Sequence, residues 1–197
     1  MLSSQATHEE LQERIHAAAE SLLEEKGIDG VQVREVAERA GTSTMGVYSR
    51  FGGKLGLLDS LYRRGFERLR QATEPLRGVG TPYEELERMA DAYRDNALRW
   101  PHHYDLMFGR SVPGFEPTED ARAEALAGFQ VWVDSVKRAT DAGALAGRPE
   151  DNAFRLWAMN HGFVSLELID MAPRGSDRAR RQRHRAAYRA FLRGLQP

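Results

Sequence analysis

Residues 42–54 carry side chains that can bind an anion or read the edge of a base pair, and none of them is acidic. Hydroxyl groups can hydrogen-bond to bases or phosphates, and a helix that enters the major groove must fit a slot about 12 Å wide. The side chains expected to point outward here are short or slim: Thr42, Ser43, Thr44, Met45, Tyr48 and Ser49. This pattern favours contact with nucleic acid.

Lys54 is expected in the first turn of a helix, where a cation opposes the helix dipole. Helix stability therefore does not account for it. A phosphate bound at the helix start would account for it, because the dipole and the ammonium group attract the same anion. Tyr48, six residues earlier, can reach the same phosphate backbone through its hydroxyl group. The sequence thus predicts a surface that faces an anion.

Two short helices, over about 33–40 and 44–50, must position these side chains. A helix-turn-helix needs a small residue where its helices cross, a glycine that can take a positive φ in the turn, and an aliphatic side chain that anchors the second helix. Ala37, Gly41 and Val47 fall at these offsets. The alternative is a helical hairpin with only a structural role.

Composition indicates an ordinary globular chain: 197 residues, 41% hydrophobic and 29% charged, with a formal net charge of −1. Residues 34–70 nevertheless hold eight basic and four acidic side chains, which allows a local surface that attracts anions. The absence of cysteine excludes disulfides and thiolate metal sites. We expect a cytoplasmic protein, since neither a secretory signal nor a membrane-spanning run is evident.

Helical periodicity predicts an all-α fold in which a three-helix N-terminal domain precedes a larger helical domain. The first helix is expected from about Thr7 to Lys26 and is followed by Gly27 as a cap. The segment Thr81–Glu84 reads as a second capping box. The expected domains are 1–54 for DNA binding, 55–80 as a connecting helix and loop, and 81–197 for effector binding and dimerisation. The later helices are expected near 54–76, 82–100, 102–109, 118–142, 149–171 and 176–194.

The stretch IHAAAESLLEEKGIDGVQVREVAERAGTSTMGVYSRFGGKLGLLDSLY, residues 15–62, resembles the DNA-binding domain of the TetR family of bacterial transcriptional regulators. The resemblance rests on Gly27, V-R-x-[IV]-A at 33–37, A-G at 40–41, T-S-T-M, V-Y at 47–48 and F-x-x-K at 51–54. A later pattern, Leu156-Trp-Ala…His161-Gly…Leu166-Glu, resembles the type of TetR-family C-terminal domain that carries this Trp…His-Gly pattern. Two residues depart from the family's pattern. Gln32 stands where a Thr or Ser helix cap is common, and Met45 stands where glycine is commoner.

The resemblance implies a homodimer that binds double-stranded operator DNA and acts as a repressor released by a small-molecule effector. By analogy, Thr44, Met45 and Ser49 would face bases. The side chains that would face phosphates are Arg34, Thr42, Ser43, Tyr48 and Lys54. The alternative is a helical small-molecule-binding protein or enzyme whose N-terminal motif is only structural.

Residues 75–82, which contain two prolines and two glycines, mark a break between helices. Aromatic residues beyond this break could line an apolar effector pocket with a few polar groups. All three tryptophans lie there, each in a different helical segment. The candidate lining residues are Tyr93, Trp100, Tyr104, Met107, Phe108, Phe129, Trp132, Trp157, Asn160 and His161. A plain aromatic core is the competing interpretation for each of them.

Other clusters favour structural roles. The pair His102-His103 lacks carboxylate or histidine partners at helical spacing, so a helix-end cap or a surface pair is favoured over a metal site. No cofactor is expected, and no complete hydrolase or phosphate-loop motif is present. The arginines of residues 174–193 could contact DNA a second time, but a solvated helix face paired with Glu84, Glu85 and Glu87 is the favoured interpretation.

Overall fold

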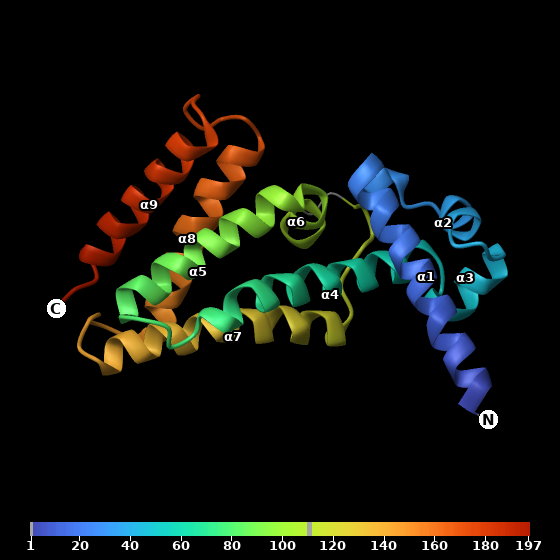
Figure 1. The fold of residues 1–197 in the computed structure, drawn as a ribbon, viewed down its shortest axis with the longest axis horizontal. Coiled ribbons are helices and arrows are strands. Elements are labelled where there is room, and N and C mark those ends of the chain that lie inside the picture. The colour runs from blue at the N-terminus through green and yellow to red at the C-terminus, as the bar shows by residue number, and fades with distance from the viewer. Residues whose placement is uncertain (1, 110–111) are drawn as a thin grey trace. The chain divides into compact units, whose positions relative to one another are not determined.

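The computed structural model describes residues 2–109 and 112–197, with side chains from residue 8 onward (Figure 1). These residues form nine α-helices and two short 3-10 helices, Ile28–Gly30 and Glu74–Leu76, without a strand. The all-α prediction is confirmed. The helices are α1 (Leu2–Lys26), α2 (Val33–Arg39), α3 (Thr44–Phe51), α4 (Lys54–Thr73), α5 (Pro82–Arg99), α6 (Pro101–Phe108), α7 (Glu119–Asp141), α8 (Pro149–Leu168) and α9 (Asp177–Arg193).

The chain divides into two compact units, each made of two segments. The first unit contains residues 1–66 and 100–125, and the second contains residues 67–99 and 126–197. Two of the three boundaries therefore fall inside helices, in α4 and in α7, and the third lies between α5 and α6. The expected domains, 1–54, 55–80 and 81–197, are continuous ranges of the chain. That division remains a prediction.

Helix α1 packs against α2 and against the 3-10 helix that follows it. Its inward face is apolar and fully buried at Ile15, Ala19, Leu22 and Leu23. The predicted end of α1 at Lys26 is confirmed, and Gly27 follows with a φ of 71°. The predicted start near Thr7 is wrong, because the helix begins at Leu2. A capping pattern inside a longer helix looks the same in sequence as one at its start.

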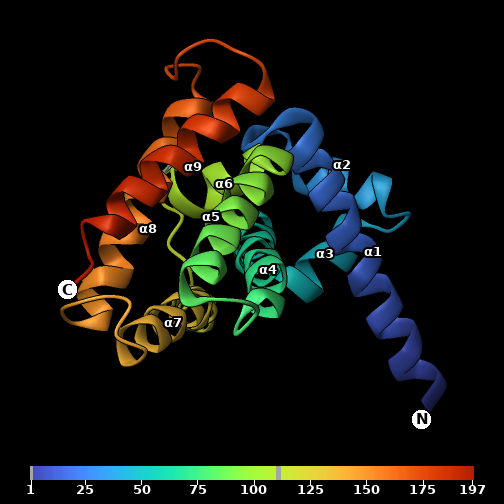
Figure 2. The same ribbon diagram turned by 60° about the vertical axis from the view of Figure 1, so that its left-hand side comes forward.

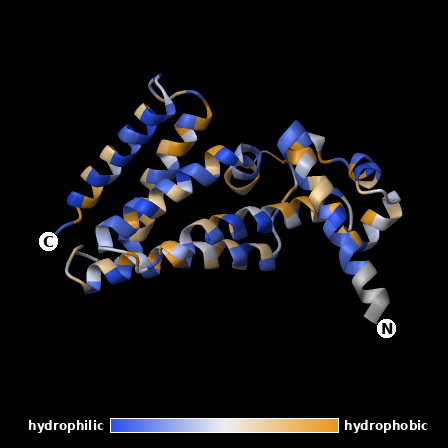
Figure 3. Ribbon diagram, viewed as in Figure 1, coloured by the Kyte–Doolittle hydropathy of each residue, from blue (hydrophilic) through white to orange (hydrophobic). Residues whose placement is uncertain are grey.

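In the second unit, α5, α8 and α9 pack against one another in pairs and lie side by side in both ribbon views (Figures 1 and 2). Hydropathy colouring shows α9 as mostly hydrophilic with apolar positions at intervals (Figure 3). The buried side chains of α9 are His184, Tyr188 and Leu192, spaced four residues apart. This spacing places all three on one face, which α5 and α8 cover.

Helix α5 begins with the predicted capping box. The Thr81 backbone N–H donates to Glu84 Oε2 at 2.9 Å, and the Glu84 N–H donates to Thr81 Oγ1 at 3.3 Å. These reciprocal bonds lower the pKa of the Glu84 carboxyl group. Two backbone donors that the first helical turn would leave unpaired are satisfied in this way.

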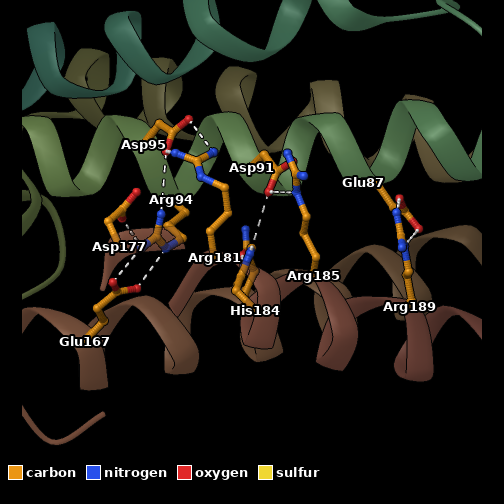
Figure 4. Close-up of polar contacts among 11 residues, drawn as sticks. Glu87, Asp91, Arg94, Asp95, Glu167, Asp177, Arg181, His184, Arg185 and Arg189 are labelled. Carbon is orange, nitrogen blue, oxygen red and sulfur yellow. Dashed lines mark hydrogen bonds and ion pairs between the residues drawn. The ribbon is translucent and has the colours of Figure 1, made fainter. Parts of the chain in front are cut away.

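Arginines of α9 form a row of ion pairs with acidic residues of α5 (Figure 4). Arg181 pairs with Asp95, Arg185 with Asp91 at 2.7 Å, and Arg189 with Glu87 at 2.7 Å. The expected pairing within the molecule is confirmed, although only Glu87 of the three expected partners takes part. Glu84 caps its own helix, and Glu85 pairs with Arg138 of α7.

One ion pair of this region is buried. Arg94 of α5 is 0% exposed and donates from Nε and Nη2 to both carboxylate oxygens of Glu167, at 2.8 and 2.6 Å. Nη2 also donates to Asp177, in the first turn of α9, at 2.8 Å. Two-point geometry and a second carboxylate compensate the desolvation of the guanidinium group, which is costly for a buried charge. Arg94 therefore joins α5 to α8 and α9.

Among the residues that the structure describes, no helix is long and apolar enough to cross a membrane. The same residues contain no group of three or more histidine, cysteine or acidic side chains arranged to hold a metal ion.

Buried histidines should make the fold sensitive to mild acid. Burial lowers the pKa of His184 below the usual 6.5, and the ring lies 2.6 Å from Asn160 Oδ1 through Nε2. The unfolded chain therefore takes up a proton near pH 6.5 while the folded ring remains neutral. This contribution to stability is complete above pH 6.5 and is lost as the pH falls toward the lowered pKa.

We expect His184→Gln to lower the free energy of unfolding at pH 7.5, because the glutamine leaves part of the buried site unfilled. The difference in free energy of unfolding between wild type and variant, measured by urea unfolding, should narrow as the pH falls below about 6.5. His8→Gln, at an exposed position, is the matched control. A difference that stays constant with pH would contradict the prediction.

Candidate nucleic-acid interface and aromatic cluster

Helices α2 and α3 form a helix-turn-helix. Gly41 has a φ of 64°, and its N–H donates to the Glu38 carbonyl at 3.1 Å. The N–H of Thr42 donates to the Ala37 carbonyl at 2.9 Å. A left-handed residue stabilised by such bonds ends a helix and turns the chain at once, which a side chain at Gly41 would oppose. Ala37 and Val47 are buried, as the spacing predicted.

Helix α3 is capped at both ends. The Ser43 hydroxyl oxygen accepts a hydrogen bond from the Gly46 N–H at 3.2 Å. Gly52 ends the helix in a left-handed conformation, and its N–H donates to the Tyr48 carbonyl at 2.9 Å. At the start of α2, by contrast, the Gln32 side chain makes no capping bond and donates instead to the Asp29 carbonyl at 2.7 Å.

The outward side of α3 carries the residues proposed to face DNA. Met45 is 73% exposed and Tyr48 is 54% exposed. Ser43, Thr44 and Ser49 are also exposed, whereas Thr42 is half-buried. The Ser49 hydroxyl donates to the Gly46 carbonyl at 3.1 Å, so this side chain is held against its own helix. Large apolar groups exposed on a small helix are typical of a contact surface.

Two cations beside this surface differ from two neighbouring cations, Arg39 and Lys26, in how they are paired. Arg39 bonds to Glu25, and Lys26 bonds to Glu35. Arg34 and Lys54 have no ion pair with any side chain that the structure describes. Charges left unpaired within the protein remain available to phosphates.

Arg50 was missed among the candidate residues. It lies on α3, and its guanidinium contacts the Gly46 carbonyl, the Ser49 hydroxyl and His8 Nδ1, at 3.3, 3.2 and 3.2 Å. Within the described part of the chain it forms no ion pair with a carboxylate. The acid-free run from residue 42 to 54 was the signal that could have identified it.

Helices α1 and α2 are joined by a polar cluster. The Arg39 guanidinium donates to both oxygens of Glu25, at 2.6 and 2.9 Å, and to the Ser21 hydroxyl. The hydrogen bonds from Arg39 and from the Ser21 hydroxyl lower the pKa of Glu25 to about 2. Because the pair is exposed, it orients α2 more than it stabilises the fold.

Five of the proposed effector-binding residues cluster in the second unit. The Tyr93 hydroxyl lies 3.0 Å from His161 Nδ1, and burial lowers the pKa of His161. Ring centroids are 6.3 Å apart for Tyr93 and Trp132, and 5.7 Å apart for Trp157 and His161. Phe129 lies 5.7 Å from Trp157. Aromatic rings with one polar pair among them suit an apolar ligand that carries a single polar group.

The other five do not join this cluster. Asn160 is fully buried, and its Oδ1 lies 2.6 Å from His184 Nε2. Trp100, Tyr104, Met107 and Phe108 belong to the first unit. There the rings of Tyr104 and Phe108 lie 4.9 Å apart. The sequence alone could not separate the two groups, since both follow the break at 75–82.

The expectation that His102-His103 forms a helix-end cap or a surface pair is wrong for His103. Its side chain is 2% exposed, and its Nδ1 lies 2.5 Å from Glu24 Oε1. Glu24 belongs to α1, so His103 joins α6 to α1 within the first unit. The partner lies 79 residues away in sequence, beyond the reach of any local spacing argument.

Comparison with known proteins gives matches over most of the chain. Residues 15–61 match the family model described as bacterial regulatory proteins, tetR family. Residues 86–187 match the model described as tetracyclin repressor-like, C-terminal domain. The HTH-type transcriptional repressor KstR of Mycolicibacterium smegmatis is 31% identical over 162 residues, which cover 68% of this chain and 78% of KstR.

Solved structures agree with this similarity. A protein of unknown function from Rhodococcus sp. RHA1 superposes with a TM-score of 0.81 at 29% identity, over 95% of this chain and 96% of that one. The TetR family transcriptional regulator PfmR from Thermus thermophilus has a TM-score of 0.68 at 21% identity, over 93% of this chain and 100% of that one. The latter likeness concerns the fold alone.

Proposed function

Because the chain belongs to the TetR family of transcriptional regulators, we propose specific roles for the residues of its helix-turn-helix. Members of this family bind operator DNA, form dimers and bind small-molecule ligands, and they are regulators rather than enzymes. The protein is thus a DNA-binding transcriptional regulator. The alternative of an enzyme with a purely structural N-terminal motif is set aside.

In the proposed interface, Thr44, Met45 and Ser49 face bases, and the remaining candidates face phosphates. The observation that supports this assignment is an exposed, acid-free α3 flanked by two cations, Arg34 on α2 and Lys54 on α4, that form no ion pair with the side chains described by the structure. Arg50 joins the phosphate-facing group for the same reason. The remaining phosphate-facing residues are Thr42, Ser43 and Tyr48.

We propose that the regulator is a repressor whose effector binds at the cluster around Tyr93 and His161. A ligand there would replace the hydrogen bond between Tyr93 and His161 with one of its own and would contact Trp132 and Trp157. The neutral form of His161, favoured by its burial, suits an uncharged polar group on an otherwise apolar ligand.

We also propose that the outward face of α8 forms the dimer interface. Leu166 is 51% exposed and Phe154 is 58% exposed, and a side chain on Gly162 would meet no atom within 4 Å. Exposed apolar side chains around an open glycine allow a second helix to approach closely. The apolar stripe of α9 is less available, because Tyr188 is 1% exposed.

Lys54→Ala should weaken binding to operator and to random duplex DNA alike, and should reduce the salt dependence by about one phosphate contact. Met45→Ala or Thr44→Ala should instead change operator preference, by about 1–3 kcal/mol at a contacted base pair. Binding titrations over a range of salt concentrations measure both effects. Lys137→Ala, which removes an equal charge from α7, is the control. An unchanged salt slope for Lys54→Ala would contradict the phosphate assignment.

Saturable quenching of tryptophan emission by uncharged aromatic or long-chain compounds should reveal effector binding. Trp157→Phe and His161→Ala should lower the affinity for such a compound by about tenfold, the loss typical of a hydrogen bond or a ring contact. Both variants should fold and should bind DNA when no effector is present. Global unfolding of both, measured by circular dichroism, would assign these side chains to the core.

Leu166→Glu should give monomers in sedimentation velocity experiments, because burying an unpaired carboxylate at an apolar interface is costly. Loss of the dimer should also lower operator affinity, since each half-site would then bind one recognition helix independently. Leu126→Glu, at an exposed position of α7, is the matched control and should remain dimeric. A dimer that survives Leu166→Glu would place the interface elsewhere.

A further inference from the structure

Gly46 and Gly53 lie under the side chains of two residues that carry hydroxyl groups. We propose that both are positioning residues for DNA binding: Gly46 leaves the space that the Thr42 hydroxyl occupies, and Gly53 leaves the space that the Tyr48 ring occupies. This inference rests on the proposed phosphate contacts of Thr42 and Tyr48. It adds two residues that would not themselves touch DNA through a side chain.

Gly46 is an interior residue of α3, where glycine lowers helix stability relative to alanine. The local reason for it is Thr42, one turn earlier. A Cβ atom on Gly46 would overlap Thr42 Oγ1, with Thr42 Cβ and Cγ2 at 3.6 Å. The Thr42 side chain therefore folds back over the first turn of α3, and its hydroxyl takes the space that a side chain at position 46 would fill.

Gly53 lies between α3 and α4 with a φ of 110°, and it is buried. A Cβ atom there would lie 3.4 Å from Tyr48 Cδ1 and 2.9 Å from Cε1, and the second distance is too short for a real contact. The edge of the Tyr48 ring thus rests on the backbone of Gly53. Because Lys54 follows at once, this places the aromatic ring beside the start of α4, where the ammonium group and the helix dipole attract an anion.

Neither hydroxyl group makes a hydrogen bond within the described part of the chain. Ser43 and Ser49, in contrast, both bond to backbone atoms of α3. Thr42 and Tyr48 therefore present donors that the protein does not use. A hydroxyl donor held in place before binding loses less entropy when it meets a phosphate oxygen.

Two neighbouring glycines supply matched controls. Gly41 and Gly52 have φ values of 64° and 70°, and a Cβ atom on either would meet nothing within 4 Å. Both are required by the backbone conformation alone. Substituting Gly52 introduces the strain of a left-handed residue without displacing a side chain that faces DNA.

The test is a pair of double-mutant cycles in the full-length protein, Gly46→Ala with Thr42→Val and Gly53→Ala with Tyr48→Phe. The probe is a duplex that wild type selects from a random-sequence library, and the readouts are Kd, salt slope and melting temperature. Backbone strain at residue 53 is the same with tyrosine and with phenylalanine, so the cycle cancels it. Gly52→Ala measures the effect of left-handed backbone strain at residue 52, where no side chain is displaced.

Thr42→Val and Tyr48→Phe should each raise Kd by about tenfold, the loss expected for one hydrogen bond to a charged group. Gly46→Ala and Gly53→Ala should raise Kd by a similar factor, but should cause little further loss once the matching hydroxyl has been removed. Gly52→Ala should raise Kd less than Gly53→Ala. Gly46→Ala should leave the melting temperature unchanged or raise it, because alanine favours the helix.

In each double variant, Kd could rise by the full product of the two single-variant factors. That result would overturn the positioning roles, since the glycines would then act independently of the hydroxyl groups. A wild-type Kd for Thr42→Val and Tyr48→Phe would instead overturn the phosphate contacts on which the inference rests. The two failures are therefore distinguishable.

Discussion

Val47 is the only buried side chain of α3, and the placement of the surface proposed to face DNA depends on it. A helix of eight residues is not stable alone in water, so one apolar anchor and two caps must hold it. Ser43 and Gly52 supply the caps. With so little of the helix committed to packing, nearly its whole outward side is available for DNA, which a helix in the major groove requires.

The glycines of this segment meet two different requirements. Gly41 and Gly52 adopt left-handed conformations that turn the chain, and their Cα atoms face open space. Gly46 instead accommodates a neighbouring side chain, and Gly53, with a φ of 110°, meets both requirements. A sequence rich in glycine next to a recognition helix can therefore serve both backbone geometry and side-chain placement, and only contact distances distinguish the two.

Charged side chains in ion pairs occupy part of the contact between helices in the second unit. Arg94 and Glu167 are both buried, and three further arginines of α9 pair with α5 at the surface. The surface pairs each contribute little to stability, whereas loss of one member of the buried pair would leave an uncompensated charge. Such an arrangement fixes which faces of α5, α8 and α9 meet, because a helix rotated about its axis would leave the carboxylates unpaired.

Local patterns in the sequence determined the helix-turn-helix, the all-α class and most helix boundaries. Ala37, Gly41, Val47 and the Thr81–Glu84 box interact with near neighbours, so their spacing carries the information. The beginning of α1 was the exception.

Only the tertiary structure decided the roles of residues whose partners are distant in sequence. His103 bonds to Glu24, Arg94 to Glu167, and Tyr93 to His161. It also divided the ten proposed effector-binding residues between two units. The physical reason is that a helix's own periodicity sets which side chains share a face, whereas packing between helices sets which faces meet. Burial, pairing and pKa all depend on the second of these.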